Sequence, residues 1–209
     1  PGWFNKKITF DTLLNSMRYL GMALSGHPYM GTGRNLAYRK TLYYKQKGFA
    51  SHLNLQRGED DLFINETAHA HNTRVETGSD SLMRIAMPKY KKICCEEKIS
   101  YAATSRLFKG TARYIMGFET CSRLLFYAAI IATIITGILL HQWTTLGIAI
   151  LLWAARFVMQ LIVFRKTAQA FGERKFCALL PVFDFLQPIW NGVFKLQRKL
   201  RRKNEFMRK

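Results

Sequence analysis

Two long apolar runs stand out in the second half of the chain. The first, residues 124–140, contains no charged residue, and the second, residues 146–164, contains one, Arg156. A helix rises about 1.5 Å per residue, so runs of this length approach the thickness of the hydrocarbon core of a bilayer. The short connection between them has no lysine or arginine, whereas basic residues flank both outer ends. The positive-inside rule therefore predicts a transmembrane hairpin in a multi-pass protein of the cell (inner) membrane, with the remaining parts cytoplasmic.

Arg156 admits two interpretations. It can face a polar channel or a lipid-linked phosphate, because a charge within a membrane segment often marks a functional site. It can instead pair within the helix bundle or reach toward a headgroup, and the pattern favours this second interpretation.

A third apolar stretch, residues 176–194, has a different pattern. It contains Pro181, Asp184 and Pro188, and strongly basic segments flank it on both sides. A single crossing would leave one of these flanks outside. Residues 165–209 are therefore expected to form an interfacial or re-entrant segment with a basic cytoplasmic tail. A third membrane span is the alternative.

The first 110 residues alternate between helix-forming and irregular segments. The pattern predicts four helices, at residues 8–24, 41–47, 59–71 and 89–109. Three glycines and a proline break regular structure at residues 26–33. Residues 35–38 are expected to form a short strand and residues 73–88 an extended segment. A basic juxtamembrane helix, residues 111–123, then leads to the first apolar run.

The net charge of +19 indicates a polyanionic partner. Nucleic acid, anionic lipid and phosphorylated substrates are the three classes to consider. Much of the positive charge flanks the apolar segments, especially near the C-terminal end of the chain, and this position favours membrane lipids. No nucleic-acid-binding signature accompanies the charge, so nucleic acid is not an expected partner.

Three consecutive acids, Glu59, Asp60 and Asp61, begin one predicted helix. They can cap the helix, bind a metal or act as a general base. A metal site needs oxygen ligands from several segments, and the sequence has no second acidic cluster, so no metal ligands are assigned within the chain. The glycine-rich stretch before residue 40 supplies hydrogen-bond donors for a ligand and aromatic faces for a sugar ring, namely Arg34, Asn35, Arg39, Tyr29 and Tyr38.

The order of these motifs resembles the C-terminal half of a membrane-bound family-2 glycosyltransferase. The resemblance covers "GTGRNLAYRK", then "KGF", then "GEDDL", an extended segment, a basic helix and paired membrane spans. It implies an α/β fold of the GT-A type, with residues 1–110 as the acceptor-side part of the catalytic domain. It also implies inverting transfer from a nucleotide-sugar donor to a glycan or lipid-linked acceptor.

The resemblance assigns roles to individual residues. Asp60 corresponds to the general base, and Glu59 and Asp61 to acids that orient the acceptor. The glycine-rich segment corresponds to the acceptor side of the cleft, with Gly31, Gly33, Arg34, Asn35 and Arg39 as substrate-binding residues. Such an enzyme uses a divalent metal, Mg or Mn, held by an Asp-x-Asp motif. Residues 1–26 contain only Asp11 and do not match that motif, so the metal ligands and the donor site are expected outside this chain.

One motif departs from the family pattern. Glu97, Ser100 and Tyr101 stand where the family often has the Gln, Arg and Trp of Gln-x-x-Arg-Trp. The change removes a cationic contact to the leaving diphosphate, for which Lys98 and Arg106 are candidate replacements. It favours a non-processive enzyme. The alternative function is a non-catalytic membrane subunit of a glycan-assembly machine.

Overall fold

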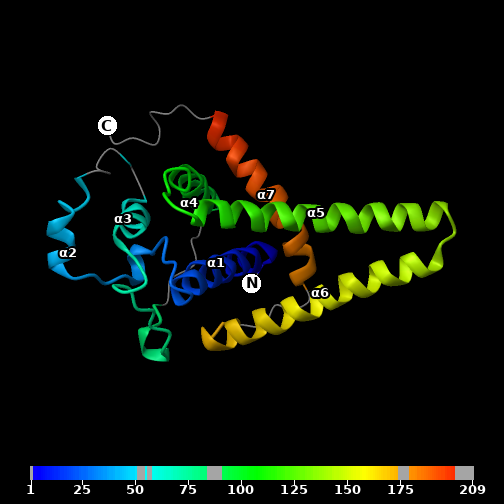
Figure 1. The fold of residues 1–209 in the computed structure, drawn as a ribbon, viewed down its shortest axis with the longest axis horizontal. Coiled ribbons are helices and arrows are strands. Elements are labelled where there is room, and N and C mark those ends of the chain that lie inside the picture. The colour runs from blue at the N-terminus through cyan, green and yellow to red at the C-terminus, as the bar shows by residue number, and fades with distance from the viewer. Residues whose placement is uncertain (1, 51–54, 56–57, 84–90, 174–178, 201–209) are drawn as a thin grey trace. The chain divides into compact units, whose positions relative to one another are not determined.

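The computed structural model describes residues 2–50, 55, 58–83, 91–173 and 179–200 (Figure 1). Of these residues, 74% are helical and none lies in a β-strand. The helices are α1 (Trp3–Leu24), η1 (Gly33–Asn35), α2 (Lys40–Lys45), α3 (Glu59–Thr67), η3 (Ser79–Ser81), α4 (Lys91–Thr104), α5 (Ala112–Leu139), α6 (Trp143–Ala170) and α7 (Leu180–Leu200). The chain divides into two compact units, one from Pro1–Arg113 and Asn191–Lys209 and the other from Tyr114–Trp190.

The prediction of an α/β domain of the GT-A type is wrong, because the described residues form a helical fold without a sheet. Residue 35, where a strand was expected to begin, ends η1, and the chain from 36 to 38 has no ladder partner among the described residues. The described part of the second segment, residues 73–83, contains the short helix η3 and no strand. A side-chain bond joins the two segments, from Asn35 Nδ2 to the Ser81 carbonyl oxygen at 3.0 Å. Strands are stabilised by paired backbone groups, and these segments lack that pairing.

The predicted helices of the first unit are confirmed, with changed boundaries. Helix α3 ends at Thr67, before the predicted end at residue 71. Asn72 explains this early end because its side chain bonds the last turn. Its Nδ2 donates to the Thr67 carbonyl at 2.8 Å, and its Oδ1 accepts from the His69 amide at 2.8 Å. The side chain thus satisfies a carbonyl group that a helix end leaves open.

A buried aspartate fixes α4 against α1. Asp11, 4% exposed, accepts from Lys7 one turn earlier at 2.5 Å and also binds Lys98 of α4. Burial lowers the pKa of Lys7 to about 8. Burial and the neighbouring Lys7 lower the pKa of Lys98 to about 7. The contact between Lys98 and Asp11 links α4 to α1 and so positions α4.

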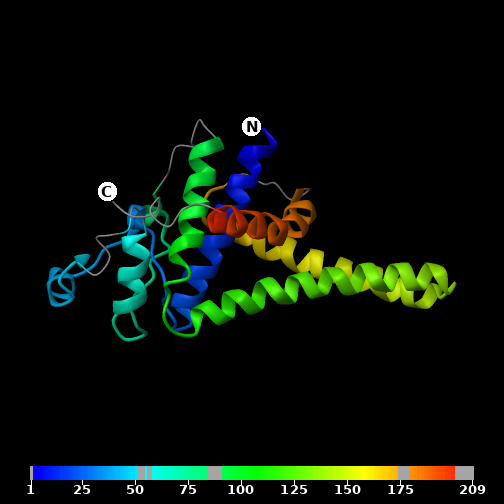
Figure 2. The same ribbon diagram turned by 90° about the horizontal axis from the view of Figure 1, so that it is seen from above.

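Helices α5 and α6 form an antiparallel hairpin that is visible in both views (Figure 1, Figure 2). Both are long and apolar enough to cross a membrane, and their most apolar windows are only 11% and 6% buried. A core helix of a soluble protein would be mostly buried, so this exposed apolar surface supports membrane association. At the tip, a Cβ added to Gly137 would lie 2.9 Å from Cγ of Leu146, so a small residue lets the two helices pack closely there.

Arg156 pairs within the second unit, as the favoured interpretation predicted. Its Nη2 lies 3.3 Å from Oδ2 of Asp184 in α7, and its guanidinium lies 4.6 Å from the centre of the Phe126 ring. Arg123 also binds Asp184, at 2.9 Å, and the Tyr127 hydroxyl donates to it at 2.6 Å. Asp184 is 2% exposed, so one buried carboxylate joins α5, α6 and α7.

Helix α7 covers most of the third apolar stretch and continues through Pro188. Residues 176–178 of that stretch lie outside the described residues. Although α7 has 21 residues, it is not among the helices of the described chain that are both long and apolar enough to cross a membrane. Its interfacial or re-entrant placement stays a prediction.

Candidate functional site

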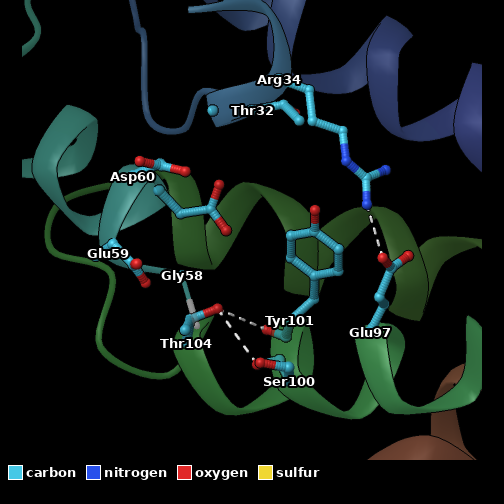
Figure 3. A pocket seen from close by; sticks show the side chains of 11 residues that line it. Thr32, Arg34, Gly58, Glu59, Asp60, Glu97, Ser100, Tyr101 and Thr104 are labelled. Atoms are coloured by element: carbon cyan, nitrogen blue, oxygen red, sulfur yellow. Dashed lines mark hydrogen bonds and ion pairs between the residues drawn. The ribbon is translucent and has the colours of Figure 1, made fainter. Parts of the chain in front are cut away.

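A cleft of about 400 Å³ in the first unit is lined by three segments that are far apart in the sequence (Figure 3). They are the η1 turn, the beginning of α3 and one face of α4. The lining residues are Thr32, Gly33 and Arg34; Gly58, Glu59, Asp60 and Asp61; and Glu97, Ser100, Tyr101 and Thr104.

The start of α3 brings the acids to this cleft. Gly58 precedes the helix with a φ of +90°, a left-handed conformation that favours glycine. A Cβ on Gly58 would overlap the methyl group of Thr104, so the glycine also allows α3 to begin directly against α4. Glu59, Asp60 and Asp61 then occupy the first turn, where the helix dipole favours negative charge. The predicted placement of the acids at a helix N-terminus is confirmed.

Gly33 leaves room for the Asp60 carboxylate. A Cβ on Gly33 would overlap Oδ2 of Asp60 and lie 2.7 Å from its Cγ. Any larger residue at position 33 would push this carboxylate aside.

Gly33→Ala is therefore expected to move the Asp60 side chain and to change stability by less than about 1 kcal/mol, because Asp60 is half-buried and can rotate. The site should lose function without unfolding. Gly21→Ala is the matched control, since a Cβ at Gly21 meets nothing within 4 Å. Thermal melting of the full-length variants, together with the activity of the site, checks this. A loss of melting temperature as large as the loss of function would contradict it.

An ion pair spans the cleft from η1 to α4. Arg34 Nη2 lies 2.7 Å from Oε1 of Glu97, and the two side chains are 52% and 29% exposed. Tyr101 projects from α4 into the space between Asp60 and Arg34 (Figure 3). Burial, followed by the charges of Asp61 and Glu97, raises the pKa of Tyr101 to about 12. Its hydroxyl is therefore protonated at neutral pH and can donate a hydrogen bond to a ligand.

The acids differ in burial and basicity. Asp60 is half-buried, and burial together with the charge of Glu59 raises its pKa. Asp61 is 3% exposed, and burial, Asp60 and Glu59 raise its pKa to about 7. Oδ2 of Asp61 has no hydrogen-bond partner in the described structure. Asp60 is thus an accessible carboxylate in the cleft, whereas Asp61 is a buried acid that gains and loses its proton near neutral pH.

Asp61 should make stability depend on pH. Its folded-state pKa, about 7, lies above the ordinary value of 3.8, so its contribution is fully present below about pH 4 and is lost as the pH rises through 7. Asp61→Asn cannot ionise. The variant should therefore gain stability relative to the wild type between pH 4 and pH 8, by up to about 4 kcal/mol. Denaturant unfolding at several pH values measures this, and a difference that does not change with pH would contradict it.

Not all of the expected substrate-binding residues reach the cleft. Gly31 packs behind it, because a Cβ there would lie 3.1 Å from Leu36 and 3.2 Å from Ile64. Asn35 bonds Ser81, and the exposed Arg39 precedes α2, and neither lines the cleft. The structure does bring together Gly33, Arg34, Glu59, Asp60 and Asp61.

The two tyrosines expected to stack on a sugar ring also lie elsewhere. Tyr29 is 3% exposed and packs edge-on against Phe108 with ring centres 5.9 Å apart. Tyr38 belongs to an aromatic cluster and lies 5.0 Å from the ring of Phe63. Of the aromatic residues in the described part of the chain, Tyr101 is the one that lines the cleft.

The α4 wall was not predicted as part of the site. Glu97, Ser100, Tyr101 and Thr104 line it, although the sequence marked three of them only as departures from a family motif. Their spacing of three and four residues places them on one helical face, and this signal could have identified them. Lys98, on another face, binds Asp11, so it does not supply the cleft with a replacement cation.

The described residues do not form a metal site, since no group of three or more His, Cys, Asp or Glu side chains is arranged to hold an ion. No step through a metal is assigned to this cleft. Comparison of the chain with models of protein families, with curated proteins and with solved structures gives no match.

Proposed function

We propose that this cleft is the acceptor site of a membrane-bound inverting glycosyltransferase, with Asp60 as general base. The observation that carries the proposal is the convergence of the glycine-rich turn, the acidic start of α3 and the Glu97–Tyr101 face on one cleft. The first two of these segments carry the resemblance in the sequence, and the third stands where the family motif is altered. The proposal assigns the nucleotide-sugar donor and its divalent metal to protein outside these residues.

Burial favours Asp60 over Asp61 as the base. Its carboxylate is half-buried, so an acceptor hydroxyl can approach it, whereas Asp61 is almost fully covered. Gly33 keeps one side of the carboxylate free of side-chain atoms. Burial and the charge of Glu59 raise the pKa of Asp60, which makes it a stronger base than an ordinary aspartate.

In the proposed reaction, Asp60 accepts the proton of an acceptor hydroxyl. The hydroxyl oxygen forms a bond to the anomeric carbon of the donor sugar from the face opposite the diphosphate. The bond from that carbon to the diphosphate oxygen breaks, and the diphosphate leaves with the electron pair. The product therefore has inverted configuration. The protonated Tyr101 hydroxyl is placed to orient the acceptor by a hydrogen bond.

The membrane hairpin supports a lipid-linked or polysaccharide acceptor. Helices α5 and α6 follow the cleft-forming residues directly in the chain. The basic flanks of the hairpin and its uncharged connection support a cytoplasmic position for the first unit at the cell (inner) membrane. Membrane lipids are the partners of the hairpin and of the basic C-terminal segment.

The test is sugar transfer by the full-length protein with Asp60→Asn. The variant should lose transfer and still bind the nucleotide-sugar donor. Normal turnover would overturn the role of Asp60 as base and would favour the alternative function, a non-catalytic membrane subunit of a glycan-assembly machine.

A further inference from the structure

One side of helix α7 packs on the protein. In its first half, which belongs to the second unit, Phe183, Asp184 and Gln187 are at most 4% exposed. In its second half, which belongs to the first unit, Phe194 is 9% exposed, and Lys98 Nζ lies 5.7 Å from the centre of its ring. With about 3.6 residues per turn, the four buried positions share one side of the helix.

The opposite side of α7 is an apolar stripe that is largely uncovered in the described structure. Its members recur every three or four residues, as a single helical face requires, and they are between 39% and 77% exposed. This α7 stripe consists of Val182, Phe185, Ile189, Val193, Leu196 and Leu200. Scattered apolar residues on a surface need no explanation, but a continuous stripe marks an interaction surface.

Three cations follow one edge of the stripe in the second half of α7. They are Lys195, Arg198 and Lys199, and helical periodicity places them about 100° from the centre of the stripe. Burial and the nearby charge of Arg106 lower the pKa of Arg198, and its Nε has no hydrogen-bond partner in the described structure. A phosphate group beside Arg198 would offset this repulsion and accept a hydrogen bond. A membrane surface supplies such phosphates next to an apolar phase.

Asp184 attaches the first half of α7 to the basic end of the hairpin. It binds Arg123 at 2.9 Å, and Arg123 directly precedes the uncharged run 124–140 of α5. This half of α7 therefore lies near the level at which α5 enters the apolar phase. In Figure 1 the first half of α7, drawn in orange, crosses the direction of α5 and α6 steeply. A third membrane span would instead run beside them.

We infer that α7 lies flat on the membrane surface at the basic end of the hairpin, with the α7 stripe among the acyl chains and its flanking cations at anionic phospholipid headgroups. Amphipathic helices with basic residues beside an apolar face bind membranes in this way. A second copy of the chain fits the stripe less well, because the two copies, each with a net charge of +19, repel each other. The inference concerns a surface outside the cleft and does not depend on the role of Asp60.

The first experiment measures the depth of the stripe in a bilayer. The full-length protein, with its cysteines other than the buried Cys94 replaced by serine, is reconstituted in vesicles of equal parts phosphatidylcholine and phosphatidylglycerol. A spin label is attached in turn to Ile189→Cys, Val193→Cys and Leu196→Cys, and its accessibility to oxygen is compared with that to a water-soluble nickel chelate. All three labels should lie at one depth, about 5–10 Å below the headgroup boundary. A label on Asp80→Cys, an exposed position of the first unit, is the aqueous control.

The other arrangements of α7 give different results. In a third membrane span the depth changes by about 1.5 Å per residue, so the labels at positions 189 and 196 would differ by roughly 10 Å. If the stripe faced water, the chelate would reach all three labels as it reaches the control. If a second copy covered the stripe, labels on the two copies would broaden each other's spectra. Each of these three outcomes would overturn the inference.

A second experiment tests the choice of lipid and keeps the native cysteines. Lys195→Gln, Arg198→Gln and Lys199→Gln are combined in the full-length protein. The association of spin-labelled phosphatidylglycerol with this variant is then measured relative to that of spin-labelled phosphatidylcholine. The preference for the anionic lipid should fall at least about fivefold, which is the effect expected of one basic residue at a membrane surface. An unchanged preference would overturn the assignment of the cations to lipid headgroups.

The matched control makes the same change in charge away from α7. It replaces the exposed Lys40, Lys45 and Lys47 by glutamine and should keep the preference for phosphatidylglycerol. Equal losses in the two triple variants would show that the net charge of the chain selects the lipid, and they would overturn the specific role of α7.

Discussion

Replacing Asp60 by asparagine in the full-length protein is expected to slow sugar transfer by about 10²–10⁴-fold, the usual contribution of a general base. Asparagine keeps the size of the side chain and its position beside Gly33, but it cannot accept the proton. Donor binding should remain near the wild-type value, because the proposal places the donor site outside this cleft. A transfer assay and a separate measurement of nucleotide-sugar affinity distinguish the two effects.

The pH profile provides a second measurement of the same role. Only the ionised carboxylate accepts a proton, so transfer should fall as the pH drops through the pKa of Asp60. Because burial and Glu59 raise this pKa, the fall should begin at a higher pH than for an ordinary aspartate. Glu66→Gln, an equal charge change elsewhere on α3, should retain both the rate and the profile. Wild-type turnover in Asp60→Asn would contradict the assignment.

Periodicity in the sequence predicted the helices well, because it reports which face of a segment is buried. The apolar runs predicted α5 and α6, and the acids before Leu62 predicted the start of α3. Helix ends were less accurate. Asn72 ends α3 through bonds to Thr67 and His69, and a side chain that bonds back to the preceding turn leaves little trace in the hydrophobic pattern.

The sheet was predicted from a resemblance and from short extended segments, and it is absent from the described residues. Local sequence can favour an extended backbone, but a sheet needs a partner strand in register. Residues 36–38 and 73–83 have no such partner among the described residues. A short sequence pattern does not show whether a partner strand elsewhere in the chain lies beside it.

The candidate site was predicted in part. Gly33, Arg34, Glu59, Asp60 and Asp61 were found because glycines and consecutive acids are conspicuous in a sequence. Gly31 and Gly33 cannot be distinguished by residue type. In the structure Gly31 packs against Leu36 and Ile64, whereas Gly33 lies beside Asp60 in the cleft. The α4 wall was missed because the Lys98–Asp11 pair, which orients that helix, joins residues 87 positions apart.

Replacing Asp184 by asparagine is expected to destabilise the second unit by about 3–5 kcal/mol, the usual cost of removing one partner from a buried ion pair. Arg123 is 8% exposed, and among the described residues Glu119, at 2.8 Å, would remain as a partner for its charge. Arg156 would lose its contact with the Asp184 carboxylate and keep its contacts with the rings of Phe126 and Tyr127. Thermal and denaturant unfolding of the full-length protein in detergent measures the change. Asp80→Asn, an exposed acid in the first unit, is the control and should cost less than about 0.5 kcal/mol.

The two arginines should differ in a way that tests the network itself. Arg156→Gln leaves Asp184 bound to Arg123 and Tyr127, and the Arg156 side chain is already 29% exposed. It should therefore cost less than Arg123→Gln, which removes the shorter and more buried ion pair. Combining Arg123→Gln with Asp184→Asn should cost less than the sum of the single changes, because each single change leaves a buried charge without its partner. Additive losses would show that the two residues act independently, and Asp184 would then not be what joins α5, α6 and α7.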